Sequence, residues 1–324
     1  MTPISKQAID PGFGRSFSGK NKRIINPDGS FNVVRNGTRF NTADTYQYLI
    51  TISWKRFIGF IIAFLVILNV LFALVYQAIG IETISGTQPG SFFDEFAQMF
   101  FFSVQTFTTV GYGAMSPVGS MTSLVASFEA MGGLIGFALA SGLLYGRFSR
   151  PTARIKYSKK AIIAPYNDTN ALMFKIVNMR SNVMMECEAR MMLVLAEKSN
   201  GKMQRNYYNL RLETHKIQFF PLTWTLVHPI DKNSPLYGMT KEELTEKGAE
   251  ILSLVKGFDD KFSQVVHSRH SYLVENMVVG AKYVPSFSTN EEGDTVLNLN
   301  SISKCERANL NATDGPFGKQ VLEK

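Results

Sequence analysis

The feature that most constrains this chain is a stretch of 90 residues, 57–146, that contains no lysine and no arginine. At its start, the 20 residues 57–76 (FIGFIIAFLVILNVLFALVY) carry Asn69 as their only strongly polar side chain. A helix of that length spans the roughly 30 Å hydrocarbon core of a bilayer. A soluble helix would need a polar face, and a signal peptide would lie closer to the N-terminus. The stretch therefore predicts a membrane span, and the glycine-containing run 121–148 predicts a second one.

Charge is distributed in blocks along the chain, whose 34 Lys and Arg outnumber its 26 Asp and Glu to give +8 overall. Residues 1–56 and 147–160 each carry a net +6, residues 57–146 carry −4, and residues 161–324 are neutral. The positive-inside rule then predicts that both termini lie in the cytoplasm and that segment 77–120 lies outside. We expect a multi-pass protein of the plasma (inner) membrane, and no nucleic-acid partner, because topology explains the basic excess.

The segment between the two spans is too apolar to be a simple loop. Ser91 followed by Asp94 and Glu95 is typical of a helix N-terminus, with acids at the positive end of the helix dipole. The helix predicted at 91–108 then continues with aromatic residues on most faces and no further charge. We expect it to re-enter the membrane, shielded from lipid by the rest of the protein.

This helix leads into Thr109, Val110, Gly111, Tyr112 and Gly113, the sequence TVGYG, which matches the selectivity filter of potassium channels. The two glycines permit the backbone angles that turn successive carbonyls toward one axis. Rings of such carbonyls from four copies would replace the hydration shell of K⁺, bound at residues 109–112, and Tyr112 would brace the ring against pore-helix aromatics. A homotetramer follows, with K⁺ as permeant ion and no cofactor.

The second span contains several glycines, of which Gly133 or Gly142 could let the helix bend as a hinge. Phe137 and Tyr145 are eight residues apart, and both are predicted to face the pore and act as a gate, with Tyr145 near the cytoplasmic mouth. Glu129 is an acid inside the membrane, so we expect it to face the helix bundle behind the filter. Whether it is a structural acid or modulates the filter stays open.

The remaining sequence divides by its pattern. Residues 1–40 form an N-terminal segment, and residues 41–53 read as an amphipathic slide helix on the membrane surface, followed by the anchor Trp54. After a basic linker, 149–160, short strand-like runs predict a β-sandwich over 161–290, in which Thr240 and Glu243 form a capping box. Residues 291–324 are polar and predict a disordered tail. The predicted pore domain has four parts: outer helix 54–78, pore helix 91–108, filter 109–113 and inner helix 120–148.

Four segments resemble inward-rectifier potassium channels, the prokaryotic KirBac group most closely. They are RFSRP (147–151), KIVNMRSN (175–182), WTLVHPIDKNSPLYGMT (224–240) and SRHSYL (268–273), and the likeness extends over residues 24–286. The resemblance implies a two-span helical pore domain with a re-entrant pore helix, plus a cytoplasmic immunoglobulin-like β-sandwich, in a homotetramer. It also implies that segment 23–34 docks onto this β domain.

The resemblance implies further roles. A cluster of basic residues after the inner helix resembles the family's site for anionic or phosphoinositide lipid headgroups: Arg147, Arg150, Arg154, Lys156, Lys159 and Lys160. Phe137 and Lys256 replace residues on which strong rectification depends, so strong rectification is not expected. Gln105 and Met115 stand where eukaryotic members have a glutamate–arginine bridge, so the filter must be braced differently.

The sequence thus predicts a K⁺-selective channel, gated at the inner-helix bundle by its cytoplasmic domain and by lipid headgroups. The alternative from another class is a membrane-anchored sensor or assembly module with a vestigial pore. An enzyme is the weakest reading, because the sequence offers no nucleophile–base pair, metal cluster or phosphate loop.

Overall fold

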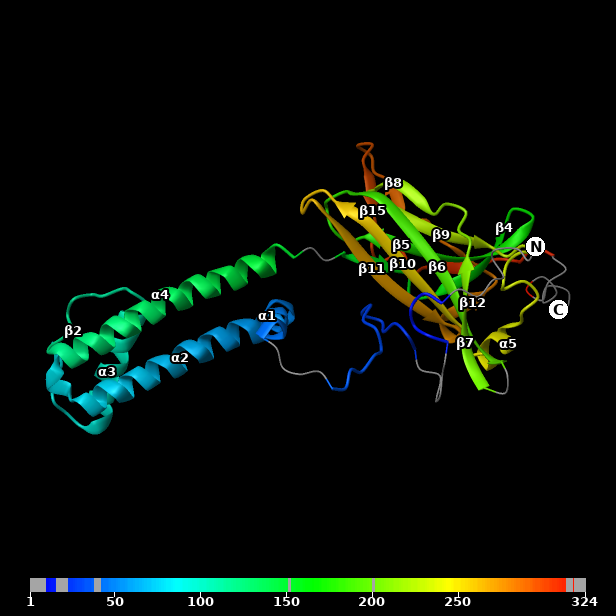
Figure 1. Ribbon diagram of the computed structural model, residues 1–324. Coiled ribbons are helices and arrows are strands. Elements are labelled where there is room, and N and C mark those ends of the chain that lie inside the picture. Colours follow the sequence, from blue (N-terminus) through cyan, green and yellow to red (C-terminus); the bar gives the residue numbers. More distant parts are fainter. Residues whose placement is uncertain are drawn as a thin grey trace. The chain divides into compact units, whose positions relative to one another are not determined.

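The computed structural model describes residues 10–15, 23–37, 42–150, 153–199, 202–312 and 317. The chain divides into two compact units (Figure 1). The helical unit comprises residues 37–150, and the β unit comprises residues 1–36 with 151–324. Parts of the predicted N-terminal segment, slide helix, linker and tail lie outside the described residues, including Pro151 of the RFSRP segment.

The described residues of the helical unit form four α-helices in chain order: α1 (Thr42–Thr51), α2 (Trp54–Ile79), α3 (Phe92–Phe107) and α4 (Ser120–Phe148). The 26-residue α2 and the 29-residue α4 are long and apolar enough to cross a membrane, with mean hydropathies of 3.0 and 1.6. Only 11% and 17% of their most apolar windows is buried within the chain. A core helix of a soluble protein would be mostly buried, so this exposure favours lipid or other subunits as the surroundings of α2 and α4.

Helix α3 lies between the two long helices and starts as the sequence predicted. The Ser91 hydroxyl accepts from the Asp94 N–H, and the Asp94 carboxylate accepts from the Ser91 N–H, so the predicted N-cap is confirmed as a capping box. The loops that flank α3 pair as two short antiparallel strands, β1 (Ile84–Ser85) and β2 (Ser116–Pro117). This pairing closes the connection between α2 and α4 outside the helices.

Apolar side chains from α2, α3 and α4 meet in one cluster. Tyr76 of α2 packs edge-on against Phe102 of α3, with ring centroids 5.1 Å apart, and Met99 and Ala126 are buried beside them. Because α3 contacts both long helices here, its orientation is set by them.

The β unit is built from two five-stranded sheets. The first has the order β11–β10–β6–β7, with β8 also paired to β6: β6 (Met184–Ser199), β7 (Lys202–Leu210), β8 (Lys216–Phe220), β10 (Glu250–Asp259) and β11 (Gln264–Leu273). The second has the order β12–β4–β5–β3, with β9 also paired to β5: β3 (Ile155–Tyr157), β4 (Ala161–Tyr166), β5 (Thr169–Asn178), β9 (Thr223–Pro229) and β12 (Met277–Val279). Only the β12–β4 pairing in these two sheets is parallel.

The two sheets share one apolar core, to which Phe174 and Ile176 of β5 contribute from one sheet and Leu193 of β6 and Val255 of β10 from the other. The predicted β-sandwich is therefore confirmed. The short helix α5 (Lys241–Glu246) begins at the predicted capping box, in which Thr240 and Glu243 exchange both hydrogen bonds.

Two predicted boundaries are wrong. The linker 149–160 contains β3, which pairs with residues 176–178 of β5, so its second half belongs to the sandwich. The tail predicted as disordered from residue 291 contains β15 (Thr295–Leu297), paired with β14 (Phe287–Thr289), and β16 (Cys305–Arg307), paired with β13 (Ala281–Tyr283). Ile302 between these strands is fully buried, and Leu310 and Phe317 belong to the apolar core of the sandwich, so a few apolar residues in a polar stretch hold this segment against the β unit.

Candidate functional site

The TVGYG segment directly follows the C-terminal end of α3 and has an alternating backbone. Thr109, Gly111 and Gly113 have φ angles of +59°, +53° and +82°, whereas Val110 and Tyr112 between them do not enter this left-handed region. Glycine adopts such angles without strain, and Thr109 is one of four residues other than glycine that do so in the described part of the chain. The alternation allows successive carbonyls to point to the same side, as a filter requires.

Backbone hydrogen bonds fix the inner half of this segment to α3. The Gln105 carbonyl accepts from the N–H groups of both Val110 and Gly111, at 3.0 and 3.3 Å. The Thr109 N–H donates to the Thr106 carbonyl at 3.1 Å. The start of the segment is therefore continuous with the last turn of the helix, whose negative dipole end lies there.

The side chains of the segment face away from their own chain. Tyr112 is 78% exposed and Val110 is 53% exposed. The sequence predicted that Tyr112 braces against pore-helix aromatics; with this exposure, such a brace has to come from another copy of the chain.

The two predicted hinge glycines differ in their surroundings. A Cβ at Gly133 would overlap the carbonyl oxygen of Phe107, the last residue of α3, whereas a Cβ at Gly142 would meet nothing within 4 Å. Gly133 therefore has a packing role, because bending α4 there would separate it from the end of α3. Gly142 is free of such a contact, and its hinge role stays a prediction.

Phe137 and Tyr145, the predicted gate residues, are each 75% exposed on α4. Leu134 and Leu139 on the same helix are exposed to a similar degree. Exposure alone does not separate pore-facing from lipid-facing positions, so the gate stays a prediction.

Arg147, near the end of α4, is used within the helical unit. Its terminal nitrogens donate to the carbonyl of Leu49 in the last turn of α1, at 2.5 Å, and to that of Ile52 just after the helix, at 2.7 Å. Its guanidinium also lies over the rings of Trp54 and Phe57, at 4.6 and 4.3 Å. A cation here satisfies carbonyls that the end of a helix leaves unpaired. The residue predicted to bind lipid headgroups therefore holds α1 to α4.

The other five predicted headgroup ligands fall in different units. Arg150 is exposed in the helical unit, and Arg154, Lys159 and Lys160 are exposed in the β unit. Lys156 donates to the Leu299 carbonyl at 2.8 Å and so anchors the C-terminal segment.

Glu129 is fully buried, as predicted, and its partners come from helices distant in sequence. Its carboxyl group accepts from the Tyr76 hydroxyl of α2 at 2.6 Å and contacts the Ser103 hydroxyl of α3. Asn69 of α2 completes the group through Ser103. Sequence reasoning missed Asn69, Tyr76 and Ser103; the lone Asn in the first span was the one available signal.

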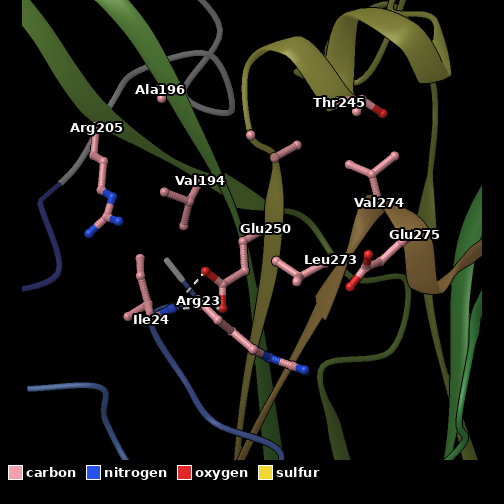
Figure 2. Close-up of a pocket in the computed structure, with 12 residues that line it drawn as sticks. Arg23, Ile24, Val194, Ala196, Arg205, Thr245, Glu250, Leu273, Val274 and Glu275 are labelled. Carbon is pink, nitrogen blue, oxygen red and sulfur yellow. Dashed lines mark hydrogen bonds between the residues drawn. The ribbon is translucent and has the colours of Figure 1, made fainter. Parts of the chain in front are cut away.

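The N-terminal segment docks onto the β unit through Glu250. The buried Glu250 carboxylate accepts from the Ile24 N–H, at 2.9 and 3.1 Å, and from the Ile25 N–H at 3.4 Å. Arg23 donates to the hydroxyl and the carbonyl of Ser271 on β11. Figure 2 shows Glu250 pointing at Ile24. Both residues line a cavity of about 170 Å³. The docking that the resemblance implied therefore combines backbone recognition by Glu250 with burial of Ile24 and Ile25 against Val194, Tyr207 and Leu252.

Lys256 stands where the resemblance implies an acidic residue involved in rectification. It lies in a charged group on the first sheet. Its ammonium is 2.8 Å from Glu188, which also pairs with Arg190 at 2.9 Å. These two cations hold the pKa of Glu188 at about 2, so the group is a carboxylate between two cations and carries a net positive charge.

The helical unit and the β unit match separate families of known proteins. Residues 63–149 match the family described as ion channel, and residues 155–315 match the family described as inward rectifier potassium channel C-terminal domain. A single chain therefore contains both an ion-channel unit and the C-terminal domain of inward rectifier potassium channels.

Individual relatives agree with this. The chain is 39% identical over 280 residues to the inward rectifier potassium channel Kirbac3.1 of Paramagnetospirillum magnetotacticum, covering 86% of this chain and 93% of that protein. It is 24% identical over 332 residues to the ATP-sensitive inward rectifier potassium channel 15 of Homo sapiens, covering 95% and 87%. The protein belongs to the inward rectifier potassium channel family, within its prokaryotic part. It is an ion channel and not an enzyme.

Proposed function

We propose that four copies of this chain form a K⁺-selective pore in which the backbone carbonyls of residues 109–112 bind the permeant ion. The observation that carries the proposal is the alternating backbone of Thr109, Gly111 and Gly113 at the end of α3. One chain supplies one such segment and leaves it exposed, so a ring of carbonyls needs several copies around an axis. The negative end of α3 would favour a cation near the filter.

The proposed setting is the plasma (inner) membrane with both termini in the cytoplasm. The support is the charge pattern: two blocks of net +6 flank a stretch that carries acids and no base. In this orientation the β unit is cytoplasmic, and Cys187 and Cys305 lie in a reducing compartment as free thiols.

The proposed gate is formed by Tyr145 and Phe137 on the inner helix α4, where four bulky side chains would close a narrow pore by dewetting. Movement would reach this end of α4 through Arg147, which connects it to α1. Anionic headgroups, phosphoinositides among them, are proposed to act on the exposed bases Arg150, Arg154, Lys159 and Lys160. Lys256 and Arg190 leave a net positive charge on the first sheet, which would repel cationic blockers. We therefore do not expect strong rectification.

Flux into proteoliposomes tests conduction. The full chain should admit K⁺ and exclude Na⁺, and equal passage of both ions would refute the proposal. Gly111→Ala should abolish conduction or selectivity. A Cβ at position 111 meets nothing within 4 Å, so the effect would come from a φ of +53°, which costs an L residue about 1–2 kcal/mol. Gly132→Ala on α4, also without a close neighbour, is the control.

A second pair of flux measurements tests lipid regulation. Vesicles with and without phosphoinositide should differ in K⁺ flux, and replacing Lys159 and Lys160 with glutamine should reduce that difference. Equal flux in both vesicles, with K⁺ selectivity intact, would remove lipid regulation and leave the channel assignment standing.

A further inference from the structure

A buried polar cluster joins the three main helices behind the filter segment. It consists of Asn69 and Tyr76 on α2, Ser103 on α3 and Glu129 on α4, none of which is more than 4% exposed. The apolar cluster of the helical unit surrounds it, with Phe102 packed on the ring of Tyr76. Polar groups in such a place have to satisfy one another, because each unpaired group is costly.

The contacts form a linear chain of oxygen atoms. The Tyr76 hydroxyl is 2.6 Å from Glu129 Oε2, and Glu129 Oε1 contacts the Ser103 hydroxyl. The same hydroxyl is 3.0 Å from Asn69 Oδ1. The Asn69 Nδ2 group donates to the Leu65 carbonyl at 2.7 Å, which fixes the amide with its oxygen toward Ser103.

The number of protons available decides whether Glu129 is ionised or neutral in this row of hydrogen bonds. Three oxygen–oxygen contacts need three protons, one in each contact. Tyr76 supplies one and Ser103 supplies one, while the Asn69 oxygen and an ionised carboxylate supply none. The Ser103 proton serves only one of the two contacts that its oxygen makes, so an ionised Glu129 would leave two acceptors facing each other at the other contact.

We infer that Glu129 is a neutral carboxylic acid whose O–H donates a hydrogen bond to Ser103, which in turn donates to Asn69, and that this hydrogen-bonded cluster positions α3 and the filter segment. Tyr76 donates to the other Glu129 oxygen. Every polar side-chain atom of the four residues then has a partner, and the membrane interior holds no charge at this point. The positioning role rests on the proposed function, whereas the protonation state does not.

The cluster can position the filter because α4 contacts α3 at two successive turns. Glu129 meets Ser103, and four residues further on in both helices Gly133 meets the carbonyl of Phe107. Two contacts one turn apart set both the height and the rotation of α3. The filter begins at Thr109, two residues beyond Phe107. A displacement of α3 at Ser103 therefore reaches the filter through less than two turns of helix.

Glutamine is the diagnostic substitution because its amide mimics a neutral acid. In Glu129→Gln the NH₂ group donates to Ser103 and the oxygen accepts from Tyr76, so the K⁺ over Na⁺ flux ratio should stay within about twofold of the wild type. Glu129→Leu has similar size but no hydrogen bond, and the ratio should fall at least tenfold. Ser127→Ala is the matched control and should change nothing, because the Ser127 hydroxyl donates to the Ser123 carbonyl of the same helix. If Glu129→Gln loses selectivity as fully as Glu129→Leu, the inference is wrong.

A variant that fails to assemble is replaced by milder ones. Tyr76→Phe and Ser103→Ala each remove one bond without adding volume, and each should lower the flux ratio severalfold while thermal unfolding of the detergent-solubilised protein changes little. Unchanged flux ratios in both would overturn the positioning role.

Infrared spectroscopy tests the proton directly and needs no ion flux. With ¹³C-labelled glutamate, the wild type in lipid should show an isotope-shifted C=O stretch of a protonated carboxylic acid at neutral pH, and Glu129→Gln should lack it. Carboxylate bands alone would overturn the inference whether or not the protein conducts. A wild type that shows the acid band but does not select K⁺ would instead refute the proposed function.

Discussion

The imidazole ring of His270 stacks on the phenol ring of Tyr157, with the ring centroids 4.6 Å apart and the planes 19° from parallel. Tyr272 closes another side of the imidazole edge-on, at 4.7 Å. Burial, followed by the nearby positive charge of Arg23, lowers the pKa of His270 to about 4. This stack joins β3 to β11, and burial makes protonation of its imidazole unfavourable.

The stability of the β unit should therefore fall between neutral and acidic pH. Because the pKa of His270 is lower in the folded than in the unfolded chain, its contribution is complete above pH 6.5 and is lost as the pH falls toward 4. The loss is up to about 3 kcal/mol. His270→Phe keeps a flat ring without a titrating proton, so its unfolding free energy should fall less between about pH 7.5 and 4.5. Urea unfolding of the full chain measures this, with exposed His267→Gln as control; parallel pH curves for wild type and His270→Phe would contradict it.

Gly133→Ala should disturb the end of α3. The added methyl group would overlap the Phe107 carbonyl, so α3 and α4 have to move apart, at a cost of about 1–3 kcal/mol. We expect a lower melting temperature in detergent and a reduced K⁺ over Na⁺ flux ratio. Gly132→Ala is the neighbouring control, since its methyl group meets nothing within 4 Å. Equal behaviour of the two variants would mean that the Gly133 contact does not matter.

Arg147→Lys should loosen α1 although it keeps the charge. Lysine cannot reach two carbonyls with a planar fork or stack in the same way on Trp54 and Phe57, so the variant should lose about 1–2 kcal/mol, the order of one charged hydrogen bond or one cation–π contact. Amide hydrogen exchange over residues 45–52 should become faster by about tenfold, with or without anionic lipid in the sample. Arg150→Lys, at an exposed position, is the control. If exchange in Arg147→Lys rises only when anionic lipid is present, headgroup binding is its main role.

Glu250→Gln should release the N-terminal segment. Glutamine has one acceptor oxygen and no charge, so the Ile24 and Ile25 amides lose a charge-assisted partner worth about 1.5–3 kcal/mol. Hydrogen exchange at these two amides should accelerate tenfold or more while strands β5 and β6 stay protected. Glu275 lines the same cavity without bonding the N-terminal segment (Figure 2), so Glu275→Gln should leave exchange at the Ile24 and Ile25 amides unchanged. Protection that survives in Glu250→Gln would assign the docking to apolar packing of Ile24 and Ile25.

Features that depend on neighbours in sequence could be predicted from the sequence. The capping boxes at Ser91 and Thr240 need only residues three apart, and the membrane spans follow from composition over 20 residues. The TVGYG segment was recognisable because its backbone geometry depends on its own glycines.

Features that depend on contacts between distant residues could not be predicted. The resemblance to inward rectifiers implies a lipid-headgroup role for Arg147, whereas its partners are carbonyls nearly one hundred residues earlier. Glu129 was placed behind the filter, but nothing local pointed to Ser103 or Tyr76. The strand inside the linker was not predicted because its sequence is rich in basic residues. In the structure the ammonium of Lys156 donates to a backbone carbonyl, and the backbone of the strand still pairs with β5.

The Glu250 carboxylate binds backbone N–H groups and not side chains, and this has an evolutionary consequence. Any residue except proline offers the same N–H at positions 24 and 25, so the two isoleucines could be exchanged for other apolar residues without losing the anchor. Position 250 has no such freedom, since a second acceptor oxygen and a charge exist only in an acid of this length. Among related chains, the anchor should therefore be traceable through one fixed glutamate facing a segment whose own sequence drifts.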